Sequence, residues 1–258
     1  MWSQGGSTRQ LPRRSVHIEV DDARLEGALT LQPEMERPAV VINGDWGVRY
    51  APRENHIASE FGDRGFGTLL VGLLILPAVT IRSGGGGIRG SYTHCRRTAG
   101  THIHVITAGS ITTEETADRS TRFATDLLAS RLSGVLEWLA HDDRTAAYTP
   151  GLFGVGPGVP TALQAVTEHG TEAGAIVGLD GRGDLPESVL GAVTVPTLLV
   201  VDGNERHLVA ANREAYRSLD GELHHCTVQW ADDDTPEVAG EIASLAANGF
   251  EQNLGKNE

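Results

Sequence analysis

Residues 151 to 158 read Gly151-Leu152-Phe153-Gly154-Val155-Gly156-Pro157-Gly158, so glycine fills four of these eight positions. The run 146–153 has the apolar character of a strand and the run 159–168 has the spacing of an amphipathic helix, so we expect a tight turn between them. Glycine suits such a turn because it accepts backbone angles that strain other residues and lets two backbones approach closely. At the centre of the turn, Gly156 has no side chain and Pro157 has no backbone N–H.

The sequence on both sides of this turn alternates short apolar runs with longer amphipathic ones. Besides 146–153, strands are expected at 16–20, 25–31, 39–42, 67–76, 173–177, 197–201 and 223–230. Helices are expected at 52–61, 119–140, 159–168, 208–219 and 236–247. This alternation is typical of an α/β protein with a doubly wound, mostly parallel sheet flanked by helices. Because ligands of such sheets bind beyond the carboxyl ends of the strands, functional residues are expected in the loops that follow them.

The chain is long and apolar enough for one large core. With 258 residues and 40% hydrophobic content, it suits a single α/β domain. We expect this domain to span 15–250, after a flexible N-terminus at 1–14 and before a C-terminal tail at 251–258. The expected helix 119–140 has an apolar face that should pack against the sheet. This face carries Phe123, Leu127, Leu128, Leu132, Val135 and Leu136.

One segment does not fit the pattern. Between Arg64 and Thr113 the sequence has no Asp or Glu, and about thirty residues, 77–110, look like an insertion between a strand and the long helix. A structureless loop of this length is uncommon in a compact domain. Three interpretations remain open: a surface loop, an active-site lid, or a translation artefact such as an out-of-frame stretch. The segment also holds three histidines, but their spacing matches no metal motif, so we expect no metal site.

The charge balance limits the classes of partner. The formal net charge is -13, so nucleic acid and anionic membranes are not expected as partners. There is no run of eighteen apolar residues and no signal-like start, so a soluble, cytoplasmic protein is expected. Cys95 and Cys226 are too few for a disulfide framework. We expect no cofactor, and a small molecule is the ligand expected in the cleft; the sequence does not indicate the oligomeric state.

Motifs spread over most of the chain resemble one family. Outside 77–110, the sequence is similar to the dienelactone-hydrolase-like branch of the α/β-hydrolases. The matching stretches are Leu25-Glu26-Gly27, Val41-Ile42-Asn43-Gly44, Pro52-Arg53-Glu54-Asn55, Gly65-Phe66-Gly67-Thr68-Leu69-Leu70-Val71, Asp118-Arg119-Ser120-Thr121-Arg122-Phe123, the stretch 151–158, Pro196-Thr197-Leu198-Leu199-Val200-Val201 and Asn212-Arg213-Glu214-Ala215. The resemblance implies an α/β-hydrolase fold with a nucleophile, a histidine and an acid in loops after separate strands.

The resemblance places the nucleophile of the G-x-S-x-G motif at Gly156, which has no hydroxyl. The residue after the nucleophile normally donates a backbone hydrogen bond to the oxyanion, and Pro157 cannot. The other oxyanion donor belongs to the loop after the third strand, at Gly44 and Asp45. A carboxylate at Asp45 should disfavour a developing negative charge there.

The resemblance places the acid in the turn after strand 197–201, where Glu205 takes its position and Asp202 is a substitute. An exposed surface acid is an equally good interpretation of Glu205. The catalytic histidine belongs in the loop after the last strand, but residues 231–235 contain none and Asp232 takes its position. Other nearby histidines are badly placed for a base: His207, His224 and His225.

These losses leave three hypotheses. The first is a degenerate hydrolase that keeps the fold for binding or assembly and lacks Ser-His-acid activity. The second is an active hydrolase or lyase that acts on small esters or lactones through water activated by Glu205 or Asp232. The third is a diverged or corrupted copy of an active hydrolase, in which the segment 77–110 and the missing catalytic groups share one cause.

Overall fold

The computed structural model describes residues 12–21, 23–31, 37–43, 52–73, 114–181, 185–218, 223–228 and 235–254. In 37–43, 114–124, 218 and 223–228 the description covers the backbone only. The segment 77–110 therefore lies outside the described residues, and its three interpretations stay open. Among the described helices, none combines the length and apolar character that crossing a bilayer requires.

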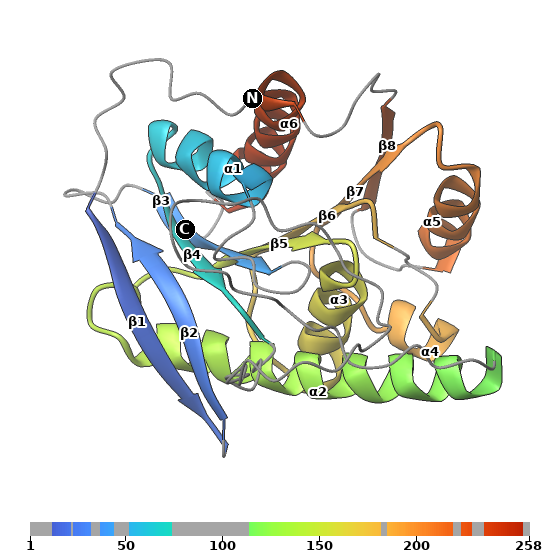
Figure 1. Cartoon of the computed structure of the whole chain (residues 1–258), viewed down its shortest axis with the longest axis horizontal. Helices are drawn as coiled ribbons and strands as arrows, with labels where there is room; N and C mark the ends of the chain where they lie inside the picture. Colours follow the sequence, from blue (N-terminus) through green and yellow to red (C-terminus); the bar gives the residue numbers. More distant parts are fainter. Residues whose placement is uncertain are drawn as a thin grey trace, which may run out of the picture.

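In the described part of the chain, eight strands form one sheet in the order β1-β2-β4-β3-β5-β6-β7-β8 (Figure 1). Their bounds are β1 Arg13–Val20, β2 Ala23–Thr30, β3 Arg37–Asn43, β4 Phe66–Val71, β5 Gly151–Val155, β6 Ala175–Leu179, β7 Thr197–Asp202 and β8 Leu223–Val228. The β1–β2 hairpin and its junction with β4 are antiparallel, and every later pairing is parallel. The expected α/β fold with a mostly parallel sheet is confirmed.

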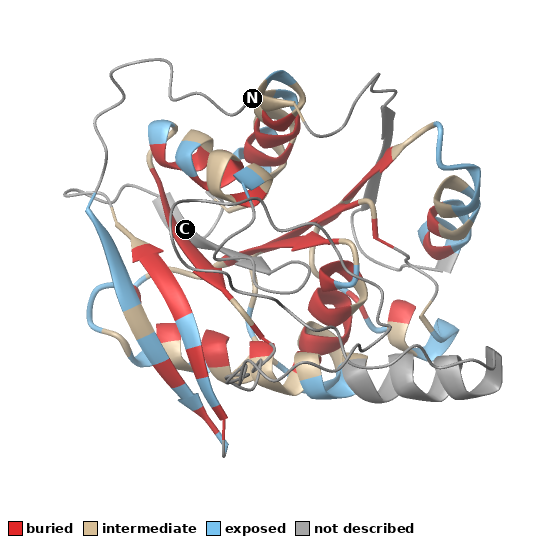
Figure 2. Ribbon diagram, viewed as in Figure 1, coloured by how far each residue is buried: buried red, intermediate tan, exposed pale blue. Residues whose placement is uncertain are grey.

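Helices cover both faces of this sheet (Figure 1). Their bounds are α1 Pro52–Asp63, α2 Glu114–His141, α3 Gly158–Glu168, α4 Glu187–Leu190, α5 Arg206–Ser218 and α6 Pro236–Asn253. Helices α1 and α6 share one apolar core with the sheet, and α2, α3 and α5 contribute to the other. Figure 2 shows β4, β5, β6 and most of β7 as buried between these layers, which the continuous apolar runs of parallel strands predict.

Four phenylalanine rings join the stretch 151–158 to the layer formed by α1 and α6. Phe61 meets Phe66, Phe153 and Phe250 edge to face, with ring centroids 5.7 to 6.1 Å apart. All four rings are buried. Edge-to-face contacts of this kind add to the apolar burial. The strand that leads into the glycine-rich turn is therefore fixed firmly from one side.

Several expected boundaries were wrong. Strand β5 begins at Gly151 rather than at residue 146, because a turn follows α2: Ala146 N donates to Asp142 O at 2.8 Å and Thr145 Oγ1 donates to Leu139 O at 2.6 Å. Strand β6 runs Ala175–Leu179 instead of 173–177. The short helix α4 was not expected, and the remaining differences are shifts of a few residues at element ends.

The expected domain limits and one face of the long helix also need correction. Strand β1 starts at Arg13, within the segment expected to be flexible, and α6 continues to Asn253, within the expected tail. On α2, Leu132, Val135 and Leu136 are buried as expected, whereas Leu127 is 38% exposed. Leu127 therefore does not belong to the buried face of α2, while Leu128 is partly buried against the core.

Candidate active site

The turn between β5 and α3 has the geometry that the glycine-rich stretch predicted. Gly156 adopts a positive φ of 54°, the left-handed region that non-glycine residues rarely occupy. Its N–H donates to Leu179 O at 2.9 Å, and its carbonyl accepts from Val159 N at 3.1 Å. The chain therefore reverses sharply from the end of β5 into the first turn of α3, and we call residues 154–158 the elbow.

Two glycines allow close backbone contacts, one within the elbow and one between the elbow and the turn after β6. A Cβ on Gly154 would lie 2.6 Å from Gly158 O, and a Cβ on Gly181 would lie 2.6 Å from Gly156 O. Both distances are far below van der Waals contact, so only glycine fits without movement of the backbone. The neighbouring strand β6 and its following turn thus hold the elbow in place.

At residues 156 and 157 the elbow has neither a nucleophilic side chain nor a free N–H donor for a substrate. Gly156 has no side chain, and its N–H is already bonded to Leu179 O. Pro157 has no N–H, and its carbonyl accepts a hydrogen bond of 2.9 Å from Thr161 Oγ1. An oxyanion hole requires unengaged donors aimed at the reacting oxygen, and residues 156 and 157 supply none. The other expected oxyanion positions, Gly44 and Asp45, lie outside the described residues.

The turn between β7 and α5 holds the expected acid. The Glu205 side chain is 53% exposed, and its Oε2 lies 3.3 Å from Nδ1 of His207, which is itself 68% exposed. Asp202 is half-buried and its Oδ1 accepts from Asn204 N at 2.9 Å, which closes the turn. Glu205 is thus placed on the surface, with its carboxylate next to the imidazole of His207. Asp232, the position expected for the base, lies outside the described residues.

Sequence reasoning missed a buried linkage that joins the two turns. Asp180 has a positive φ of 48°, and its Oδ1 accepts from Asp202 N at 3.0 Å. Asn212 on α5 is fully buried, and its Nδ2 donates to Gly181 O at 2.7 Å and to Leu208 O at 2.9 Å. The Asp-Gly pair after a strand was the available signal, since that dipeptide is typical of turns with positive φ. We call Asp180, Gly181 and Asn212 the β6 clamp.

The described side chains do not gather into a metal site. Within the described ranges, no group of three or more His, Cys, Asp or Glu side chains is close enough to hold an ion. A groove of about 160 Å³ lies between α6 and the starts of β6 and β7, at the amino edge of the sheet and so opposite the elbow. Ligands of doubly wound sheets bind at the carboxyl edge, so we do not assign this groove to the elbow's chemistry.

Comparison with known proteins gives relatives of two kinds. No family model matches the chain. Two curated proteins from Mycobacterium tuberculosis strains, each named a putative phosphoribosyl transferase, are 29% identical over 242 residues, which cover 93% of this chain and 46% of theirs. The chain therefore spans about half the length of these relatives.

Solved structures match the whole fold. A dienelactone hydrolase from Anabaena variabilis is 28% identical and has a TM-score of 0.73, with 95% of this chain and 100% of that chain covered. A dienelactone hydrolase-like promiscuous phosphotriesterase from metagenomic libraries has 14% identity and a TM-score of 0.66, with 95% and 99% covered. A serine hydrolase without a lid from Xanthomonas campestris has 12% identity and a TM-score of 0.61, with 93% and 94% covered.

Proposed function

Because the chain is a dienelactone-hydrolase-like member of the α/β-hydrolase superfamily, we propose that it keeps this fold for binding or assembly and lacks Ser-His-acid hydrolysis. One observation carries the proposal. The elbow has the positive φ and the close glycine contacts of a nucleophile turn, yet Gly156 occupies its centre and Pro157 follows. The backbone that presents a nucleophile is present, but residue 156 has no hydroxyl and residue 157 has no backbone N–H.

The expected loss of rate is large. Removal of the nucleophile alone lowers turnover by about a million-fold in a well-studied serine protease. Loss of a single oxyanion donor costs on the order of a hundred- to a thousand-fold. A water molecule in place of the missing side chain would need two to four polar partners. The amide of Gly156 is engaged and Pro157 has none, so the elbow gives such a water little support.

Carboxylate-activated water is the second candidate mechanism. A general base must lie within hydrogen-bond reach of the proton that it removes. Glu205 points its carboxylate at the exposed His207, which makes it a weak candidate for that role. A measured turnover that falls at least about tenfold in Glu205→Gln, with the fold unchanged, would support this mechanism over the first proposal.

The length and the name of the mycobacterial relatives are relevant to the proposed role in assembly. They are about twice as long as the segment that they share with this chain, and this chain itself matches a dienelactone hydrolase over 100% of the latter's length. We propose no phosphoribosyl transfer for this chain, because it spans about half the length of the relatives that carry that name. In those relatives the segment that this chain matches is joined to further sequence, which favours a role in assembly.

The test combines labelling with turnover. The full chain is incubated with a serine-reactive fluorophosphonate and its intact mass is measured, with an active serine hydrolase as the positive control for the probe. The same protein and a Gly156→Ser/Pro157→Thr variant are assayed on short-chain aryl esters and lactones. We expect no mass increase for the unmodified chain and background turnover for both proteins. Stoichiometric labelling or clear ester turnover by the unmodified chain would overturn the proposal.

A further inference from the structure

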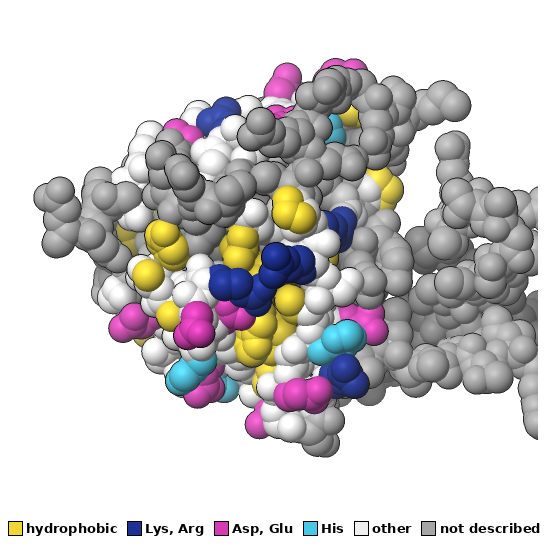
Figure 3. Space-filling view, turned by 90° about the vertical axis from the view of Figure 1, so that its left-hand side faces the viewer, with side chains coloured by type: hydrophobic (Ala, Val, Ile, Leu, Met, Phe, Trp, Pro, Cys, Tyr) yellow, Lys and Arg dark blue, Asp and Glu magenta, His cyan; other side chains and the backbone are white. Residues whose placement is uncertain are grey.

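Three Asp-Gly pairs occur in the chain, and two of them stand at the carboxyl ends of strands. Asp180-Gly181 follows β6, Asp202-Gly203 begins with the last residue of β7, and the third pair, at 220–221, lies outside the described residues. Glycine after aspartate leaves its amide nitrogen open to the carboxyl group of that aspartate, because no side chain shields it. Acidic side chains are common on the surface (Figure 3), so acidity alone does not distinguish one pair from the other.

The carboxyl group of Asp202 is folded over the amide of Gly203. Its Oδ1 accepts from Asn204 N at 2.9 Å, an Asx turn in which the side chain reaches past the amide of the intervening residue. The carboxyl carbon and the nitrogen of Gly203 are therefore held near each other, as an intramolecular reaction requires. Asp202 and Gly203 are half-buried and the next two residues are exposed, so water reaches this turn.

The pair after β6 lacks this arrangement. Asp180 Oδ1 accepts from Asp202 N, so its carboxyl group is directed to the end of β7 and not along its own turn. Gly181 is buried, and a Cβ at its position would lie 2.6 Å from Gly156 O, so the backbone around it is tightly packed. The same dipeptide is thus locked after β6 and poised to react at the end of β7.

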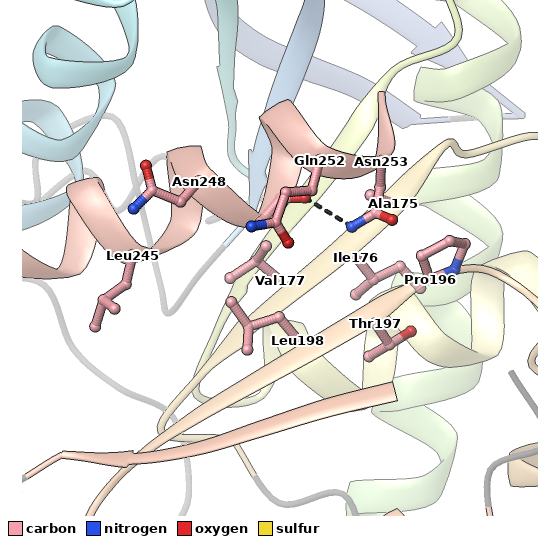
Figure 4. Close-up of a pocket in the computed structure, with 11 residues that line it drawn as sticks. Ala175, Ile176, Val177, Pro196, Thr197, Leu198, Leu245, Asn248, Gln252 and Asn253 are labelled. Atoms are coloured by element: carbon pink, nitrogen blue, oxygen red, sulfur yellow. Dashed lines mark hydrogen bonds between the residues drawn. The ribbon is translucent and has the colours of Figure 1, made fainter. Parts of the chain in front are cut away.

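An Asn-Gly pair on α6 is protected in a different way. Asn248 lies on α6 beside the groove, where Figure 4 shows its side chain. Its Oδ1 accepts from Arg64 Nη1 at 3.0 Å, and the helix continues through Gly249 to Asn253. A ring between this side chain and the next amide would break the helix, so the dipeptide alone does not decide where the reaction occurs.

We propose that Asp202-Gly203 is a site of spontaneous isomerisation to isoaspartate. The nitrogen of Gly203 attacks Cγ of the protonated Asp202 carboxyl group, the N–H proton and the hydroxyl leave as one water, and a succinimide ring forms. Water then opens the ring at the former backbone carbonyl, which breaks its bond to the Gly203 nitrogen and leaves a free α-carboxylate. No atom is oxidised or reduced, and the mass of the chain is unchanged.

The product would change the turn between β7 and α5. Isoaspartate adds one methylene to the main chain and converts the Asp202 carbonyl, which accepts from Glu205 N at 3.1 Å, into a carboxylate. It also removes the Asx turn that holds Asn204 N. Glu205 would therefore move relative to the elbow, and the new carboxylate would suit a protein carboxyl methyltransferase that recognises isoaspartate. The proposal does not depend on whether the elbow is catalytic.

The first test compares the two described Asp-Gly pairs in the full chain. The protein is warmed for several weeks at mildly acidic pH, and its peptides are then separated by chromatography and identified by mass spectrometry. An isoaspartyl methyltransferase with labelled S-adenosylmethionine marks the peptides that carry isoaspartate. We expect isoaspartate to form at position 202 at least about tenfold faster than at position 180. Equal rates at the two positions, or no isoaspartate at position 202, would overturn the proposal.

Two variants of the same turn test the geometry. Gly203→Ala adds a methyl group beside the attacking nitrogen at a residue that is not among the described glycines with positive φ, so the product at position 202 should fall at least about tenfold. Asp202→Asn keeps the oxygen of the Asx turn and offers ammonia as a better leaving group, so it should react faster and gain a carboxylate. Gly203→Ala that reacts at the unmodified rate, or Asp202→Asn that keeps its amide, would contradict the assignment. If a variant does not fold, the comparison within the unmodified chain decides the question.

Discussion

The elbow and the turn between β7 and α5 lie at the same edge of the sheet, yet they are held in different ways. At the elbow, backbone atoms contact backbone atoms, and a single added Cβ would lie 2.6 Å from a carbonyl oxygen. In the other turn, Glu205 and His207 form a solvent-exposed contact, with both side chains more than half exposed. Packing therefore fixes the elbow whatever its chemistry, whereas the position of the acid depends on a weak surface contact.

The β6 clamp explains why the elbow keeps its shape without a nucleophile. Gly181 rests against Gly156, and Asn212 holds the carbonyl of Gly181 from inside α5. These contacts involve buried atoms whose loss costs stability in an inactive protein as much as in an active one. Four substitutions can break or sharpen the contrast between the elbow and the acid turn.

Gly154→Ala should have the largest effect. Its new Cβ would meet the backbone of Gly158 at 2.6 Å, so β5 and α3 must separate, at a cost of about 3 kcal/mol in the free energy of unfolding. Unfolding in denaturant measures this change in the free energy of unfolding. Gly240→Ala is the control, because its Cβ meets nothing within 4 Å and α6 should gain up to about 1 kcal/mol from the better helix former. Unchanged stability in Gly154→Ala would show that the elbow is not tightly packed.

Asn212→Ala should come second. It leaves the buried carbonyl of Gly181 without its donor, so we expect a loss of about 2 kcal/mol. Asn253→Ala is the matched control, because Asn253 also donates to a carbonyl four residues earlier but is only half-buried on α6. Thermal unfolding compares the two variants. Similar midpoints would mean that the β6 clamp contributes no more than a surface bond.

Gly156→Ser should cost about 1 kcal/mol, since it forces a side chain onto a residue with a φ of 54°. Gly170→Ser isolates the backbone contribution, because Gly170 has a φ of 62° and open space around its Cβ position. Urea titrations of both variants give the comparison. A much larger loss at position 156 would reveal a steric restriction beyond the backbone angle.

Glu205→Gln should have the smallest effect. An exposed ion pair contributes less than about 0.5 kcal/mol, and salt weakens it further. Unfolding in low and high salt should give nearly the same stability for the variant and the unmodified chain. A loss above 1 kcal/mol would indicate that Glu205 has a buried partner. Glu205 would then again be a candidate residue of the active site.

The sequence predicted local features well and contacts across the fold poorly. The elbow could be predicted because its glycines, its strand and its helix are contiguous, and the parallel sheet followed from the alternation of runs. The β6 clamp could not, because it joins residues 22 and 31 positions apart. The resemblance gave Glu205 a position, but exposure depends on neighbours that no local pattern contains. The early start assigned to β5 failed because the hydroxyl of Thr145 extends the preceding turn.

The backbone angle at Gly156 also determines how easily single substitutions could turn the elbow into a catalytic site. Glycine avoids the strain that a hydroxyl-bearing side chain would bring to a backbone φ of 54°, so glycine at position 156 stabilises this turn. Gly156→Ser would therefore lower the stability of the fold, and it would bring no activity while Pro157 stays in place. A route to catalysis that begins with serine at position 156 would therefore pass through a less stable protein that gains no activity.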